Sequence, residues 1–295
     1  IMNQNKIYTL VDRGIIYING EDSFQFLQNI LTNDVSKITG NNSCFSSLLT
    51  PQGKYLFDFI IVKHKKGFFI DCEKGQIEEL LKQLLLYRLR SKVEILNLSN
   101  EFVVAALDKE KFLSFKDTKD QAGYTIRLNE DPLFLDPRNK KLGARLIINS
   151  EKLILSIEKL KLVASDHQEY YNLSYKLGIP QIGTDKLKNK IFGIECNFEE
   201  LNGIDFKKGC YVGQENTSRI KLRNKLSKRL FSIKIVEGKA NIDEDIKIGD
   251  EVIGKILIGE QNPFALIKCK VENFDFSKEY FSKSAKIKIL KPDWM

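Results

Sequence analysis

The chain has 295 residues, of which 42% are hydrophobic and 10% aromatic, and this composition excludes a disordered or fibrous protein. Its formal net charge of +8 favours encounters with anions, including nucleic acid, polyanionic cofactors and acidic proteins, without selecting among them. A chain of this length can form two or three domains, and we expect a monomer.

The cysteines and the apolar runs indicate the cellular compartment in which the protein is expected. The five cysteines lie far apart and include no CxxC pair, as in a reducing compartment and unlike a disulfide framework. With only His64 and His167 beside them, clustered ligands for zinc or for a tightly bound iron–sulfur cluster are missing, so we predict no metal site. No apolar run reaches the roughly 18 residues of a membrane span, and residues 1–10 lack the apolar region of a secretory signal. We therefore expect a cytoplasmic protein that does not bind membranes.

The N-terminal part of the chain alternates strand and helix patterns. Residues 7–19 predict two short strands around a turn at 12–14, and a helix begins at Asp22 or Ser23. A second, amphipathic helix is expected over 76–89. Short apolar segments predict strands at 55–62, 68–72, 93–98 and 102–107, the first two forming a hairpin. Strand–helix units with antiparallel hairpins favour an α+β architecture.

The middle of the chain is expected to continue this architecture. Residues 124–128 and 144–148 predict strands, separated by a turn-rich stretch at 131–143. Two helices follow, and Ser165 is a suitable N-cap for the second, which ends before Pro180.

After Arg229 the pattern changes to short strands joined by Gly, Asp and Asn turns, with almost no helix. These strands are expected at 230–236, 251–258, 264–271 and 285–290. We therefore divide the chain into an α+β region at 1–227, with two subdomains of which the second lies at roughly 22–110, and a small β-barrel domain at 228–295.

The most informative segment is Lys-Lys-Gly-Cys-Tyr-Val-Gly-Gln-Glu at 207–215. Its two glycines permit positive φ and close backbone approach, and a helix is expected to start near Gly213 or Gln214. Two lysines before Cys210 and a helix N-terminus after it would stabilise a thiolate, which favours a reactive or ligand-contacting cysteine. A buried cysteine in a turn is the alternative.

Residues 208–215 resemble the signature segment of the YgfZ family, a branch of the glycine-cleavage T-protein-like (GcvT-like) superfamily. Further short motifs occur in the order found in that family, and they extend the resemblance over most of the chain. These motifs lie at 31–34, 50–54, 87–93, 136–138, 142–143, 177–180 and 197–203.

The resemblance implies a GcvT-like fold, in which two interleaved α+β units and a C-terminal β-barrel surround a central cavity. It also implies a tetrahydrofolate or folate-derived cofactor and a role in iron–sulfur cluster assembly or repair, with effects on cluster-dependent tRNA modification. Iron–sulfur proteins or their assembly factors would be the partners. On this basis Cys210 and Asp58 are the candidate catalytic residues. The candidate folate contacts are Asp58, Arg88, Lys208, Gly209, Tyr211, Gly213, Gln214 and Glu215.

The same superfamily contains the aminomethyltransferase of glycine cleavage, a tetrahydrofolate-dependent one-carbon transferase. That enzyme resembles this chain around two adjacent aspartates; its catalytic one matches Asp58, whereas Phe57 replaces the other and Lys54 replaces a glycine. The resemblance therefore favours the YgfZ branch and leaves the transferase as the alternative. Asp58, in an otherwise apolar strand, could accept a hydrogen bond from a pterin N–H or pair with Arg88 or Arg90.

A basic run without an acidic residue follows the signature, comprising Arg219, Lys221, Arg223, Lys225, Lys228 and Arg229. On a helix, Arg219 and Arg223 share one face, and Lys221 and Lys225 share another. A solvated helix face is one interpretation. The other is a surface for an anionic partner: tRNA, an acidic protein or a polyglutamyl folate tail. Aromatic residues are missing from the run, so base stacking has no support.

Overall fold

The computed structural model describes residues 2–295, which form two compact units. The first unit comprises residues up to Leu48, Phe57–Tyr170 and Leu201–Val212. The second comprises Leu49–Leu56, Tyr171–Glu200 and Gly213–Met295. The first strand of the C-terminal barrel begins at Lys228, yet the second unit also takes up earlier segments, so the division of domains at residue 227 stays a prediction.

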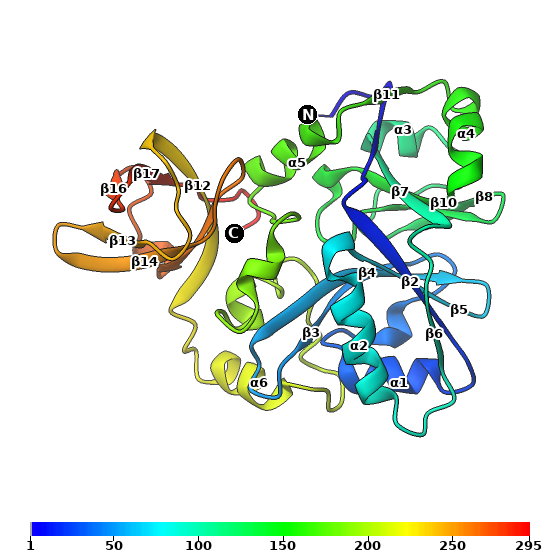
Figure 1. The fold of residues 1–295 in the computed structure, drawn as a ribbon, viewed down its shortest axis with the longest axis horizontal. Coiled ribbons are helices and arrows are strands. Elements are labelled where there is room, and N and C mark those ends of the chain that lie inside the picture. The colour runs from blue at the N-terminus through cyan, green and yellow to red at the C-terminus, as the bar shows by residue number, and fades with distance from the viewer. Residues whose placement is uncertain (1) are drawn as a thin grey trace. The chain divides into compact units, whose positions relative to one another are not determined.

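A six-stranded sheet in the first unit has the order β11-β1-β7-β10-β9-β8 (Figure 1). Its strands are β1 (Lys6–Thr9), β7 (Phe102–Leu107), β8 (Thr125–Leu128), β9 (Asp131–Leu135), β10 (Ala144–Asn149) and β11 (Val163–Ser165). Only β1 and β11 run parallel; the other neighbours are antiparallel. β9 lies where the sequence predicts turns, because Asp131 and Pro132 are common in turns. β10 pairs with β9 only from Leu133 on, so the missing N–H of Pro132 breaks no bond to β10.

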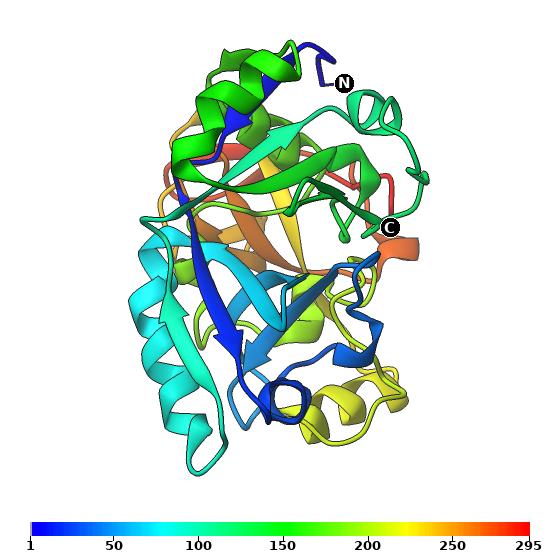
Figure 2. The ribbon, with the colours of Figure 1, turned by 90° about the vertical axis from the view of Figure 1, so that its right-hand side faces the viewer.

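A five-stranded sheet has the order β3-β4-β5-β2-β6. Its strands are β2 (Arg13–Asn19), β3 (Cys44–Leu49), β4 (Tyr55–His64), β5 (Gly67–Glu73) and β6 (Glu94–Asn97). The predicted hairpin is confirmed, since β4 and β5 pair antiparallel up to His64 and Gly67. Helix α2 (Ile77–Arg88) packs against β2 and β6, as both views of the ribbon show (Figures 1 and 2). Its inward residues are Ile77, Leu80 and Leu84, the spacing expected of one helix face.

The remaining helices are short. They are α1 (Ser23–Ile30), α3 (Lys109–Leu113), α4 (Leu153–Lys159), α5 (His167–Lys176) and α6 (Gln214–Leu222). Three-residue or four-residue 3-10 helices occur at Val35–Lys37, Lys74–Gln76, Lys140–Leu142, Ser150–Lys152, Thr184–Leu187, Gly193–Cys196 and Val271–Asn273. The prediction that Ser165 caps α5 is wrong. Ser165 ends β11, and the carboxylate of Asp166 accepts the N–H of Gln168 at 2.9 Å instead.

The C-terminal strands close into a six-stranded barrel, drawn in yellow to red in Figure 1. In barrel order they are β12 (Lys228–Gly238), β15 (Phe264–Lys268), β14 (Glu251–Ile258), β13 (Asp245–Ile248), β16 (Tyr280–Phe281) and β17 (Ala285–Ile289). Its interior is filled by apolar side chains, among them Phe231, Ile233, Ile246, Ile256, Ile267 and Ile287. The predicted α+β class with a C-terminal barrel is therefore confirmed. The central cavity that the resemblance implies, surrounded by the α+β units and the barrel, stays a prediction.

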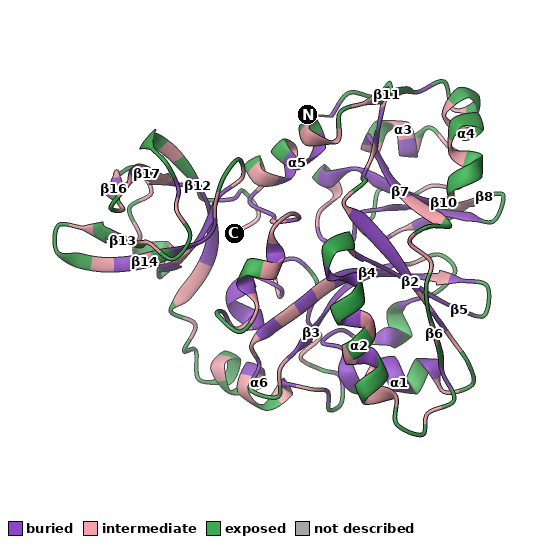
Figure 3. Cartoon of the chain, viewed as in Figure 1, coloured by how far each residue is buried: buried purple, intermediate pink, exposed green. Residues whose placement is uncertain are grey.

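Strands β2, β7 and β10 are mainly buried and purple in Figure 3, whereas β6, β11 and α4 have no buried residue. Among residues 2–295, no helix is both long and apolar enough to span a membrane.

Candidate functional site

Lys208, the first residue of the signature segment (residues 208–215), is buried against the end of α1. Its ammonium group donates hydrogen bonds to the carbonyl oxygens of Gln28, Leu31 and Asn33 at 2.8, 2.6 and 2.9 Å. The last carbonyls of a helix lack partners within the helix and carry partial negative charge, so they offset part of the cost of burying the ammonium group. Lys208 thus fastens the signature segment to α1.

The surroundings of Lys208 shift its ionisation. Burial lowers the pKa of the ammonium group to about 8, although Asp34 and Asp205 act in the opposite direction. The ammonium also lies 5.1 Å from the ring centroid of Tyr211, within range of a cation–π contact. Lys208 was expected to stabilise a thiolate at Cys210, but its charged group is directed at α1. A folate contact by Lys208 or Tyr211 stays a prediction.

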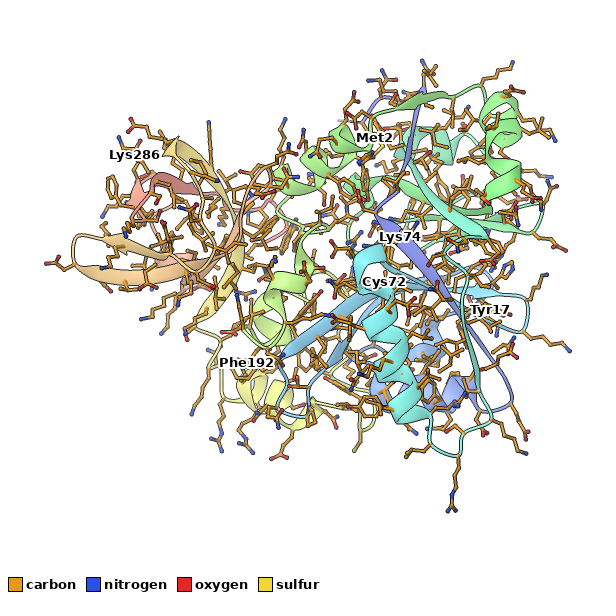
Figure 4. The ribbon with its side chains drawn as sticks, viewed as in Figure 1. Met2, Tyr17, Cys72, Lys74, Phe192 and Lys286 are labelled. Carbon is orange, nitrogen blue, oxygen red and sulfur yellow. The ribbon has the colours of Figure 1, made fainter. Side chains whose placement is uncertain are left out.

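Cys210 is the exposed thiol of this chain, and the other four cysteines are buried. Burial raises the pKa of Cys44 to about 12 and that of Cys269 to about 11. Burial also raises the pKa of Cys72, labelled on β5 in Figure 4. Since thiolates are the nucleophiles and metal ligands, the buried thiols are poorly suited to such chemistry. The alternative of a buried turn cysteine is therefore wrong for Cys210.

The two glycines of the signature segment differ. Gly213 has φ +85°, and a Cβ there would lie 2.6 Å from the carbonyl oxygen of Thr50. The predicted close approach is confirmed at Gly213, which also precedes α6 as its N-cap. Gly209 is exposed, and a Cβ there would meet nothing within 4 Å. Close packing therefore does not require glycine at position 209.

Helix α6 begins at Gln214, as predicted, and ends at Leu222. Arg223 is the C-cap of α6, and its N–H donates to the carbonyl of Arg219 at 3.1 Å, so these two residues stay one helical turn apart as expected. Lys225 lies beyond the helix, so its expected helical pairing with Lys221 is wrong. Exposed Glu215 accepts a hydrogen bond from Arg219 at 2.5 Å.

Part of the basic run is neutralised by acids from elsewhere in the second unit. Lys221 lies 2.6 Å from Glu199, and Arg229 lies 2.7 Å from Glu200. The sequence alone could not predict these ion pairs, because the glutamates lie before the signature segment and only the fold brings them next to the basic run. Pairing reduces the net charge that the run offers to an anion.

Asp58 and Arg88 come from separate elements of the first unit. Asp58 is half-buried on β4 between two buried phenylalanines, and its charge is one of the factors that raise the pKa of Cys72. Arg88 is the last residue of α2 and is half-buried. A folate contact by Asp58, Arg88, Gln214 or Glu215 stays a prediction.

A buried ionic network in the first unit was not predicted. Asp71 on β5 accepts a hydrogen bond from Arg13 Nε at 2.7 Å and pairs with Arg145 on β10. Asp136, after β9, accepts from Arg138 Nη2 at 2.7 Å and lies 3.8 Å from Arg145 Nε. All five side chains are almost fully buried, so this network joins the two sheets.

The network keeps its carboxylates ionised. Burial raises the pKa of Asp71, but the guanidinium groups of Arg13 and Arg145 outweigh it and hold the pKa below its ordinary value. Asp136 behaves in the same way, because Arg138 and Arg145 outweigh its burial and lower its pKa. The sequence signal was present in part, since the Asp-Pro-Arg motif at 136–138 belongs to the resemblance.

Residues 2–295 contain no group of three His, Cys, Asp or Glu side chains arranged to hold a metal ion.

Comparison with solved structures identifies the architecture. The chain matches the crystal structure of glycine cleavage system aminomethyltransferase T from Bartonella henselae with a TM-score of 0.77. The match covers 98% of this chain and 86% of that one, at 13% sequence identity. The chain has a GcvT-like fold.

Curated proteins with similar sequences are iron–sulfur cluster assembly factors by name. A Dictyostelium discoideum protein named iron–sulfur cluster assembly factor IBA57 homolog, mitochondrial, is 31% identical over 274 residues. The mouse factor IBA57, mitochondrial, is 27% identical over 243 residues. These matches cover 81% and 77% of this chain and 66% of each relative. A Neurospora crassa homologue is 30% identical, and the chain spans 52% of it. The chain thus spans between about half and just under two thirds of these relatives.

The likeness to the aminomethyltransferase, at 13% identity, shows a GcvT-like fold and no more. The relatives carry the name IBA57, and membership of the YgfZ branch stays a prediction. No family model matches the chain. The expectation of a cytoplasmic protein is wrong, because the relatives are named mitochondrial proteins. A reducing compartment explains dispersed cysteines equally well in either place, so cysteine usage could not distinguish them.

Proposed function

We propose that this GcvT-like protein is an iron–sulfur cluster assembly factor of the YgfZ branch that acts in mitochondria. The observation that carries the proposal is sequence similarity over 81% of the chain to a factor of that name. Iron–sulfur proteins or other assembly factors are its partners in this proposal.

Cys210 is the residue through which the chain engages a cluster. Its exposure supports this role, because iron of an incoming cluster must reach the sulfur atom. Clusters are generally held by several thiolates, so one exposed cysteine supplies one ligand and the partner supplies the others. The cluster is then cargo in transit. The fastening of Lys208 to α1 supports the role by holding the neighbouring backbone in place.

Tetrahydrofolate binding and an effect on cluster-dependent tRNA modification are finer parts of this proposal. They rest on the signature segment and on the half-buried carboxylate of Asp58. The overall likeness to an aminomethyltransferase is a likeness of fold, so it supports a folate site only weakly. A folate there would contact Asp58, Arg88 and Tyr211.

A tetrahydrofolate-dependent one-carbon transferase is the second candidate. It requires Asp58 to hold or move a proton at its carboxylate, and it requires no thiol at position 210. The exposed thiol is therefore the feature that separates the two candidates.

Anaerobic reconstitution tests the assembly role. Purified protein is incubated with ferric iron, sulfide and glutathione, so that no further oxidant is needed, and bound cluster is measured by visible circular dichroism. We expect a cluster signal from the wild type and from Cys44→Ala, whose thiol is buried, and at least a tenfold weaker signal from Cys210→Ala. Equal signals from Cys210→Ala and Cys44→Ala would remove Cys210 from the proposal.

A further inference from the structure

The second unit has a cavity of about 450 Å³ on the barrel, which we call the barrel groove. Its apolar floor is formed by Val252 and Leu257 of β14 and Leu266 of β15. Small-molecule sites typically have volumes of about 300–1,000 Å³, with an apolar lining and a few polar groups. The barrel groove has the size and the lining of such a site.

The rim of the barrel groove carries more positive than negative charge. Four lysines and two aspartates line it. Two of the lysines are matched: Lys190 lies 3.1 Å from Asp243, and Lys255 lies 3.8 Å from Asp245. The excess charge therefore belongs to the other two lysines.

These two lysines, Lys228 and Lys268, lie directly opposite each other on β12 and β15. Like charges at such positions repel, and within residues 2–295 neither ammonium has a carboxylate at salt-bridge distance. Glu195 acts on Lys228 from a greater distance. Its carboxylate is buried and accepts the N–H of Phe192, labelled in Figure 4, at 2.8 Å. An anion between the two lysines would relieve their repulsion.

We propose that the barrel groove binds a small organic anion, with its carboxylate or phosphate group between Lys228 and Lys268 and its apolar body on Val252, Leu257 and Leu266. Neither lysine belongs to the signature segment, so this site is independent of the proposed cluster chemistry. A bare anion would use the lysines alone, and a neutral apolar molecule would use the floor alone.

The test is calorimetric titration of the full chain with four probes. Phenyl phosphate and phenylacetate carry both an apolar body and a charge, inorganic phosphate carries charge alone, and benzyl alcohol carries the apolar body alone. We expect the first two to bind at least tenfold more tightly than the last two. The stronger of the first two identifies the preferred acid group. Failure of both to bind saturably would overturn the proposal.

The barrel supplies a matched control for the lysines. Lys234 and Lys288 also lie opposite each other, on β12 and β17, but they do not line the barrel groove. Lys228→Ala/Lys268→Ala should weaken phenyl phosphate binding at least tenfold, and Lys234→Ala/Lys288→Ala should change it less than twofold. Equal losses from the two double variants would reduce the effect to net charge and overturn the site.

A third variant tests the apolar floor. Val252→Ser on half-buried Val252 should weaken phenyl phosphate binding severalfold and leave inorganic phosphate binding unchanged. Unchanged phenyl phosphate binding would contradict the placement of the apolar body.

Discussion

Lys208 has a role at the residue scale that its type alone does not reveal. A lysine close to a cysteine in sequence suggests that its charge stabilises the thiolate. Here the ammonium group of Lys208 donates instead to three backbone carbonyl oxygens. The preference of cations for helix C-termini explains the choice. Its contribution to the signature segment is therefore positional.

Lys208 should make stability depend on pH in the alkaline range. Its pKa falls from an ordinary 10.5 to about 8 on folding, so between these values the unfolded chain binds more protons than the folded one. The free energy of unfolding should therefore rise with pH between about pH 8 and 10.5, by about 3 kcal/mol in total. Below about pH 8, ionisation of Lys208 should not change it. Urea denaturation of the wild type and Lys208→Met measures this. The wild type should gain stability relative to the variant from pH 8 upward; a constant difference would contradict the assignment.

At the scale of elements, periodicity predicted most strands and helices, including the hairpin of β4 and β5 and the start of α6. It missed β9, whose Asp131 and Pro132 are turn formers, because antiparallel pairing on both sides overrides that preference. It also missed β13 and β16, which have four and two residues and are stabilised by barrel closure.

The parts of the candidate site that lie together in sequence could be predicted from the sequence, and the parts that lie far apart in sequence could not. The signature segment and Cys210 stand out in the sequence, but the three acceptors of Lys208 lie 175–180 residues away along the chain. Asp71 and Arg145 are likewise 74 residues apart, and their pairing depends on the register of two sheets. Such partners require the tertiary structure.

The two glycines of the signature segment, which leads into α6, should differ in how strongly an alanine in their place destabilises the protein. Gly213→Ala should lower the free energy of unfolding by about 1–3 kcal/mol, because of its positive φ and the 2.6 Å approach to the Thr50 carbonyl. Gly209→Ala should change it by less than about 0.5 kcal/mol, since the space around Gly209 is open. Thermal and chemical denaturation measure both. Similar losses for the two variants would show that the distinction between the glycines is mistaken.

At the scale of the whole molecule, fold and chemistry carry different information. The likeness to the aminomethyltransferase fixes the architecture at 13% identity, and one architecture can support unrelated chemistries. Sequence similarity to the IBA57 proteins supports the assembly role instead. These relatives are longer than this chain, so the role of the whole relative is a hypothesis for it.

Complementation tests the assembly role most directly. The chain is expressed in the mitochondria of cells that lack their own IBA57 relative, and the activity of a mitochondrial iron–sulfur enzyme is measured. We expect the wild type and Cys44→Ala to restore this activity, and Cys210→Ala, expressed at the same level, to restore less than about a tenth of it. Full restoration by Cys210→Ala would contradict a role of Cys210 in cluster assembly.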